Sequence, residues 1–183
     1  MPFTATYRRR LRERALDQYG YVTTRDAEEL GIPPVELRKL YQRGGLEHIG
    51  RGLYRFDDIP RTGRDQFMEA VLRVGPDAVL VGDAVLALHD LALANPRRLR
   101  VATRKRARQQ LPAFLKVEQR ELAPEEQTVY EGIPTTTVAK ALLDCRGKIM
   151  NERLLEAAHE AIRTGLLRRN EAKRVFAELG AAS

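Results

Sequence analysis

Glycine and proline divide residues 1–58 of this chain into short helices followed by two strands. Apolar side chains recur at helical spacing over residues 7–19, and Gly20 is placed to end that first helix. A second, shorter helix is expected to begin at a Thr23 or Thr24 cap, because acidic residues suited to a first helical turn follow these threonines. Gly31 would end the second helix after about two turns.

The following residues predict a third helix and a β-hairpin. Pro33-Pro34 opens the segment VELRKLYQRG, where proline is tolerated because N–H groups of a first turn have no partner within the helix. Strand-forming residues then flank Gly50-Arg51-Gly52, a tight-turn signal. A short helix, a turn, a second helix and a hairpin are the plan of a winged helix-turn-helix, which we expect over residues 1–60.

Residues 61–183 are expected to form a second domain of the α/β type. After a joint at Pro60–Gly63, helical spacing of apolar residues alternates with segments of period two. The fold class expected for the whole chain is therefore α+β and mostly helical, with a small, mainly antiparallel sheet and C-terminal helices in the second domain. The expected helices are 64–74, 84–93, 138–147 and two in the tail, and the expected β segments are 78–81, 99–105, 114–122 and 128–138.

Composition excludes several classes of protein. Hydrophobic residues make up 43% of the 183 residues, enough for a core, and Cys145 is the single cysteine, which excludes a disulfide scaffold. No apolar run approaches the ~20 residues needed to span a bilayer, and no apolar segment of a secretory signal follows the basic N-terminus. We therefore expect a soluble, cytoplasmic protein with no membrane partner.

The net charge favours a polyanionic partner. The chain has 32 Lys and Arg against 25 Asp and Glu, a formal net charge of +7. Residues 97–120 hold nine basic residues and one acid, Glu118, whereas residues 121–131 hold four glutamates and no basic residue. Two surfaces for different partners, or a strand pair with its own salt bridges, would both produce this pattern. The overall basic balance is typical of proteins that bind nucleic acid.

The third helix carries the strongest candidates for contact with DNA, because the second helix of a helix-turn-helix enters the major groove. Arg38 and Lys39 are suited to guanine, and Gln42 is suited to adenine. The basic first helix and the preceding cap would add phosphate contacts. The alternative is a winged helix with solvated charges and no role in DNA binding. The expected DNA-binding residues are Thr24, Arg25, Glu36, Arg38, Lys39, Gln42, Arg43, Arg51 and Arg55.

Aromatic residues near these candidates are expected to have a structural role. Tyr41, Tyr54 and Phe56 are interpreted as core or hinge packing rather than as groups that stack on bases.

Side chains with catalytic potential do not form a recognisable active-site motif. The sequence contains no HExxH, CxxC, Walker or GxGxxG pattern. Cys145 lies in an apolar stretch and is interpreted as a small core residue, Asp83 as a helix cap and Asp90 as a surface residue. We therefore expect no enzyme activity, no catalytic residues, no cofactor and no metal.

Four segments resemble the AbiEi-type antitoxins, the partners of AbiEii/MenT-like nucleotidyltransferase toxins. They are YVTTRDAEELGI with PVELRKLYQRGGLEHIGRGLYRF, DAVLVGDAVLALHDL, the basic region 99–117, and EGIPTTTVAKALLDC. The last departs mildly from the family pattern, with Thr135 where an apolar residue is expected. Related chains continue into a longer C-terminal region, so this chain would be a short member.

The resemblance implies an antitoxin that represses its own operon. The winged helix would bind operator DNA at inverted repeats, as a monomer or homodimer, and the rest of the chain would neutralise a toxin that transfers nucleotides to tRNA. Such a toxin needs a basic groove, so the basic block at 97–120 is expected to help hold DNA instead. The toxin-binding residues are expected to be Glu121, Glu125, Glu126 and Glu131, or else to lie on the C-terminal helices.

Two other interpretations remain open. One is a winged-helix transcriptional regulator whose C-terminal domain dimerises or binds a ligand. The other is a nucleic-acid-processing enzyme with a winged-helix reader, for which the sequence offers no catalytic site.

Overall fold

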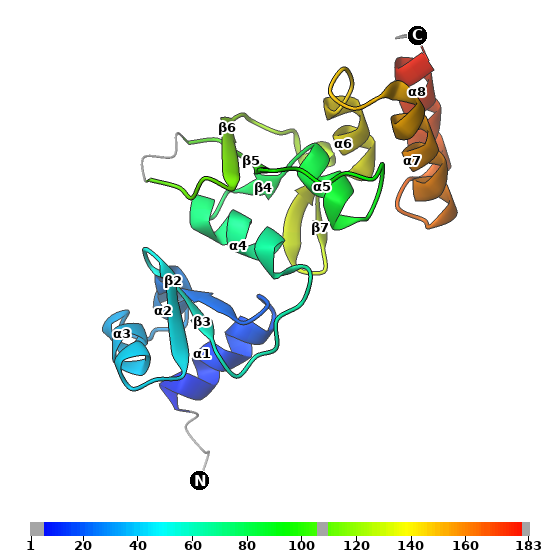
Figure 1. Ribbon diagram of the computed structural model, residues 1–183. Helices are drawn as coiled ribbons and strands as arrows, with labels where there is room; N and C mark the ends of the chain where they lie inside the picture. Colours follow the sequence, from blue (N-terminus) through cyan, green and yellow to red (C-terminus); the bar gives the residue numbers. More distant parts are fainter. Residues whose placement is uncertain (1–5, 106–109, 181–183) are drawn as a thin grey trace. The chain divides into compact units, whose positions relative to one another are not determined.

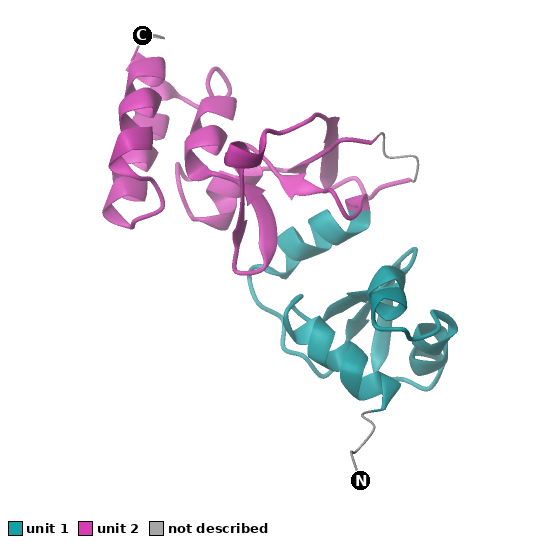
Figure 2. Cartoon of the chain, turned by 180° about the vertical axis from the view of Figure 1, so that it is seen from behind, with its two compact units in different colours: residues 1–73 teal, residues 74–183 magenta. Residues whose placement is uncertain are grey.

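Helices and two separate β-sheets make up the computed structural model, which describes residues 6–105 and 110–180 (Figure 1). The expected α+β class is confirmed. The chain divides into two compact units, Met1–Arg73 and Val74–Ser183 (Figure 2). Helix α4, Asp65–Val74, belongs to the first unit in all but its last residue, although the sequence placed it in the second domain. The expected boundary at residue 60, between a DNA-binding domain and an antitoxin domain, stays a prediction.

The first unit places its helices around a three-stranded antiparallel sheet of order β1-β3-β2. Helix α1 ends at Leu16 rather than at Tyr19, because Tyr19 and Gly20 have positive φ values of 56° and 89° and turn the chain into a short strand. Its elements before α4 are α1 Tyr7–Leu16, β1 Tyr21–Thr23, α2 Thr24–Glu29, α3 Val35–Gln42, β2 Leu46–Gly50 and β3 Leu53–Phe56.

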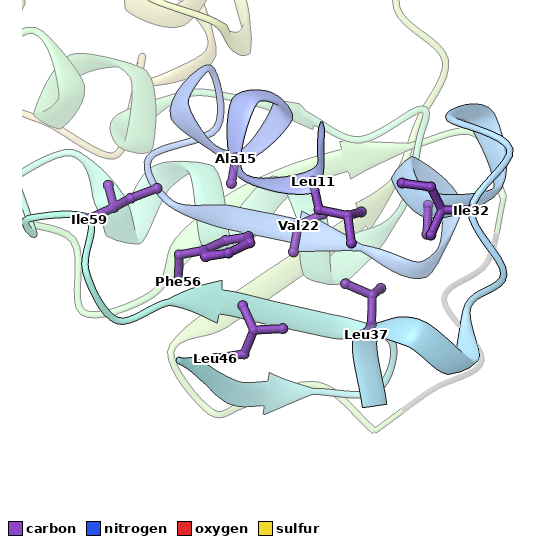
Figure 3. Close-up of a cluster of buried hydrophobic side chains, with 9 residues drawn as sticks. Leu11, Ala15, Val22, Ile32, Leu37, Leu46, Phe56 and Ile59 are labelled. Carbon is purple, nitrogen blue, oxygen red and sulfur yellow. The ribbon is translucent and has the colours of Figure 1, made fainter. Parts of the chain in front are cut away.

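A cluster of buried apolar side chains joins the helices α1–α3 to one face of this sheet (Figure 3). Leu37 from α3 packs in the same cluster as Leu46 from β2 and Phe56 from β3. This burial fixes which side of α3 faces inward, so the opposite side of the helix is left for solvent. The cluster consists of Leu11, Ala15, Val22, Ala27, Ile32, Leu37, Leu46, Phe56 and Ile59.

Polar contacts connect the strands of this sheet to α4. Tyr21 and Arg55 are register partners on β1 and β3, so their side chains share the sheet face opposite Phe56. The Tyr21 hydroxyl donates to the Glu69 carboxylate at 2.9 Å, and Arg73 Nη2 donates to the Ile49 carbonyl at 2.6 Å. These hydrogen bonds therefore link α4 to β1 and to the hairpin.

The second unit is built on a five-stranded sheet of order β6-β5-β4-β8-β7. The β4–β5 and β7–β8 pairs are antiparallel, whereas β5–β6 and β4–β8 are parallel. The expectation of a mainly antiparallel sheet is therefore wrong, because parallel partners are not joined by a hairpin and leave no turn signal in the sequence.

The elements of the second unit follow the predicted order, except that the β segment expected over 128–138 is two strands and an unexpected 3₁₀ turn precedes it. Its strands are β4 Val79–Leu80, β5 Leu99–Thr103, β6 Leu115–Gln119, β7 Gln127–Tyr130 and β8 Ile133–Thr136. Its helices are α5 Asp83–Leu88, the 3₁₀ turn η1 Pro124–Glu126, α6 Val138–Asp144, α7 Asn151–Arg163 and α8 Arg169–Gly180. Within the described residues, no helix has the length and apolar character needed to cross a membrane.

Candidate nucleic-acid interface

The start of α2 is bound to the turn of the hairpin. Thr23 and Asp26 form a reciprocal capping box, in which the Thr23 hydroxyl accepts from the Asp26 N–H at 3.1 Å and the Asp26 carboxylate accepts from the Thr23 N–H at 2.7 Å. The next N–H, that of Thr24, donates to the Gly52 carbonyl at 2.9 Å. A Cβ atom at Gly52 would lie 2.9 Å from Thr24 Oγ1, so a larger residue would force these two segments apart.

Helix α3 presents polar side chains on the face opposite its buried Leu37. Arg38, Gln42 and Arg43 are exposed and have no polar partner within residues 6–105 and 110–180. Lys39 is exposed too, but its Nζ lies 2.7 Å from the carboxylate of the half-buried Glu36. Of the charged residues expected on this helix, the two arginines are therefore the ones that keep an unpaired charge.

Two further cations accompany those of α3. Arg25 lies in the first turn of α2, and Arg51 lies in the hairpin turn between β2 and β3. Both are exposed, and neither has a polar partner in the described part of the chain. Because Thr24 is bonded to Gly52, the α2 start that bears Arg25 is connected to the turn that bears Arg51.

Arg55 does not join this surface, which corrects the expectation that it contacts DNA. Its side chain is 2% exposed and donates to the Phe56 carbonyl at 3.1 Å and to the Ile59 carbonyl at 2.7 Å. A third contact, at 3.3 Å, joins its Nη2 to the Asp65 carboxylate. The physical reason is that Asp65, the first residue of α4, pairs with Arg55 on this face of the sheet. The sequence pattern of the hairpin alone does not indicate that contact.

Most arginines of α1 contact other groups within the first unit. Arg12 lies 2.9 Å from Asp58, and Arg14 lies 3.4 Å from Asp26 and 3.3 Å from Glu29. Arg10 donates to a backbone carbonyl, that of Leu30. These contacts explain the basic character of α1 without a phosphate partner.

Three aromatic rings, from Tyr41, His48 and Tyr54, form a cluster that includes two residues expected to be structural. The ring centroids of Tyr41 and His48 are 5.9 Å apart, and those of His48 and Tyr54 are 5.2 Å apart. Tyr41 is 46% exposed, His48 is exposed and Tyr54 is half-buried. Phe56 is fully buried, so of the aromatic residues interpreted as packing it alone is wholly part of the core.

The acidic stretch of the second unit has mixed surroundings. Glu121, Glu125 and Glu131 are exposed, and Glu121 lies 4.0 Å from Arg104. Glu126 accepts from Lys140 Nζ at 2.9 Å and from the Ala123 N–H at 3.1 Å, and the Lys140 contact foremost holds the pKa of its carboxyl below the ordinary range. Glu126 therefore already contacts a cation of α6.

The basic block at 97–120 is partly internal. Arg100 is 6% exposed and lies 2.8 Å from Glu118, and Arg120 lies 2.6 Å from Asp144. Salt bridges within the strand pair were one of the two explanations that the sequence left open for the charge pattern. Other members are exposed, namely Arg97, Arg98, Arg104, Lys105 and Lys116, while Arg106 and Arg108 lie outside the described residues.

Residues considered for catalysis lie in structural positions. Cys145 is fully buried, and this burial raises the pKa of its thiol to about 12. Asp83 is the first residue of α5 rather than its cap, which is Gly82 with φ 59°. The His89 ring lies 4.2 Å from that of Tyr130, and no group of three His, Cys, Asp or Glu residues suited to a metal occurs within the described ranges.

Comparisons with known proteins bear on the first unit. Residues 9–56 match a protein family described as "Transcriptional regulator, AbiEi antitoxin". The crystal structure of the RV2827C protein from Mycobacterium tuberculosis is similar to this chain with a TM-score of 0.48 and 14% sequence identity, over 94% of this chain and 72% of that one. No curated protein matches the chain.

The matched segment runs from α1 to the end of β3, so it includes α2, α3 and the hairpin. The description of the family is regulatory rather than catalytic. It names both a transcriptional regulator and an antitoxin, the two roles that the resemblance implied. The resemblance to the AbiEi-type antitoxins is thereby confirmed over residues 9–56, the segment that matches this family of transcriptional regulators.

Proposed function

We propose that the first unit is a winged helix-turn-helix and that the protein represses its own operon by binding operator DNA. In this proposal α2 and α3 are the helix pair, and β2 with β3 is the wing. The observation that carries it is the set of exposed cations on these elements that have no partner among residues 6–105 and 110–180, namely Arg25, Arg38, Arg43 and Arg51. The family match over the same residues supports the assignment.

Each exposed residue has a distinct role in the proposed complex. Arg38 would donate to the O6 and N7 atoms of a guanine from the major groove, and Gln42 would pair with an adenine. Arg51 would reach a phosphate or the minor groove beside the wing. Arg25, with the N–H groups at the start of α2, would contact a phosphate of the backbone.

Inverted repeats are the operator architecture that the family resemblance implies. One unit carries one reading helix, so a repeat of opposite orientation would take a second copy of the chain. Several phosphate contacts for each copy would make the affinity fall steeply with salt concentration.

DNA binding is tested with a duplex taken from the region directly upstream of the gene for this chain. Fluorescence anisotropy should show binding at low salt, weaker binding at high salt, and a preference over a scrambled duplex of equal length and composition. Equal binding to both duplexes would overturn the repressor function, and absence of binding to either would overturn the DNA-binding function as a whole.

We also propose that the protein neutralises a nucleotidyltransferase toxin through the second unit. The antitoxin description of the family supports this role in general terms. Glu121, Glu125 and Glu131 are exposed near β7 and fit a basic toxin surface, whereas like charges would repel the basic block. Glu126 would have to give up its contact with Lys140 to bind a toxin.

Toxin neutralisation is tested by co-expression with the product of the neighbouring gene, provided that this product is a nucleotidyltransferase. The wild-type chain should restore growth, and reversal of Glu121, Glu125, Glu126 and Glu131 to Lys should abolish the rescue. Glu28→Lys, at an exposed acid of the first unit, is the control and should rescue like the wild type. Unchanged rescue by the fourfold variant would exclude the acidic stretch as the toxin surface.

A further inference from the structure

The ring cluster of Tyr41, His48 and Tyr54, hereafter the aromatic surface, brings together side chains from three different elements. Tyr41 belongs to α3, His48 to β2 and Tyr54 to β3. The centroids of the two tyrosine rings are 6.3 Å apart, and His48 is close to both. These rings therefore connect α3 with the hairpin.

We propose that the aromatic surface contacts the sugar-phosphate backbone of DNA, between the groove contact of α3 and the contact of the hairpin turn. This inference rests on the proposed DNA-binding function and adds residues to that site. The occupant is a DNA strand, because cations stand on both sides of the rings.

The spacing of the residues places the rings between two of the unpaired cations. Arg38 and Tyr41 are three residues apart on α3 and so are neighbours on the helix surface. His48 and Tyr54 are register partners near the turn that bears Arg51. A strand that reaches Arg38 and Arg51 together passes over the residues that join them, which are the three rings.

The hydroxyl groups of the aromatic surface are available for a ligand. The Tyr21 hydroxyl donates to Glu69, but the hydroxyls of Tyr41 and Tyr54 have no hydrogen-bond partner within residues 6–105 and 110–180. A phenolic O–H is a good donor to a phosphate oxygen, and an exposed ring packs well against a deoxyribose.

Contacts of this kind have a signature that separates them from contacts of arginine. A tyrosine hydroxyl is neutral, so its hydrogen bond to a phosphate adds affinity without neutralising the phosphate charge. Its loss weakens binding to every sequence, while the slope of log affinity against log salt stays constant. If the hydroxyls had a purely structural role, their removal would change neither the affinity nor the salt slope.

The experiment compares the double variant Tyr41→Phe, Tyr54→Phe with the wild type at pH 8, by fluorescence anisotropy across a range of salt concentrations. The probes are the upstream duplex and its scrambled counterpart. We expect the double variant to bind both duplexes about tenfold more weakly, with the salt slope of the wild type. The matched control is Tyr7→Phe on α1, where the ring is 44% exposed, and it should bind like the wild type.

Each other outcome has a defined meaning. Affinity of the double variant within twofold of the wild type overturns the inference, and so does a salt slope that falls with the affinity. Thermal melting of the variants checks the fold, which substitution of a hydroxyl by hydrogen leaves intact. If the wild type binds neither duplex, the proposed DNA-binding function fails first, which is distinct from failure of the aromatic contact alone.

Discussion

Arg55 and Asp65 form an ion pair in the interior of the first unit, with Nη2 3.3 Å from the carboxylate and the two side chains 2% and 7% exposed. Arg55→Met should leave the Asp65 charge buried without its partner, and should lower the free energy of unfolding by about 3–5 kcal/mol. Urea denaturation measures this loss.

The exposed pair of Arg61 and Glu47 is the control for that substitution. Its nitrogen and oxygen are 2.6 Å apart, but the side chains are 56% and 46% exposed. Arg61→Met should therefore cost only about 0–1 kcal/mol, because water screens the pair. Equal costs at the two arginines would contradict the role assigned to burial.

Arg38 and Arg51 should affect DNA binding in different ways. Arg38→Ala should cost about 1–3 kcal/mol on the upstream duplex and reduce the preference over scrambled DNA, since it removes a contact to a base. Arg51→Ala should weaken binding to both duplexes and lower the salt slope by about one, since it removes a phosphate contact. Anisotropy titrations distinguish the two.

A matched cation in the second unit controls for net charge in these titrations. Arg153 is exposed on α7, and Arg153→Ala should bind DNA like the wild type. If Arg38→Ala left the affinity for operator DNA unchanged at low salt, α3 would not be the helix that reads the bases.

Thr23 should contribute to stability through the cap of α2. Thr23→Ala removes the hydroxyl that accepts from the Asp26 N–H, and should lower the free energy of unfolding by about 0.5–2 kcal/mol. Thr23→Ser keeps the hydroxyl and should retain most of the stability. Thermal or urea denaturation of the two variants tests the difference, and equal loss from both would assign the effect to the methyl group.

Cys145 should make the protein less stable as the pH rises above about 9. Burial raises the pKa of its thiol to about 12 in the folded chain, from an ordinary value of 9.0. Between these values the unfolded thiol loses its proton while the folded thiol keeps it, so rising pH favours the unfolded state. Urea midpoints at pH 8 and pH 9.5 measure the effect.

The variant Cys145→Ala separates this thiol from other alkaline effects. Its stability should fall less between pH 8 and pH 9.5 than that of the wild type, although its stability at pH 8 is lower because a buried side chain is truncated. Tyr21 has a raised pKa as well, through burial and the contact with Glu69, and adds a loss of the same sign at higher pH. Parallel pH profiles for the two proteins would exclude a contribution from the thiol.

Local structure was predictable where the signal lies within a few residues. Thr23, one of the two expected caps, begins α2, and the hairpin turn lies at Arg51 and Gly52 as expected. Even here the bounds shifted: the β segment expected over 128–138 is two strands, β7 and β8, because Glu131 and Gly132 form a turn between them with φ values of 47° and 82°.

The candidate site was only partly predictable. The exposure of Arg38 and Arg51 follows from the helical and hairpin patterns, and the family resemblance follows from the same segment. The unpaired hydroxyl of Tyr41 and its contact with His48 were missed, because a tyrosine in an apolar stripe has the same sequence signature in a core as at its rim. The roles of these residues in binding DNA stay predictions.

By itself, the sequence determined most of the order of helices and strands, the hairpin turn at Gly50–Gly52 and the α+β class, because caps, glycines and apolar periods act on neighbouring residues. The tertiary structure alone decided that Arg55 is buried against Asp65, that Arg100 pairs internally with Glu118, and that β4 and β8 run parallel. Those outcomes depend on how separate elements pack against one another, and packing, not local propensity, sets which charges water can reach.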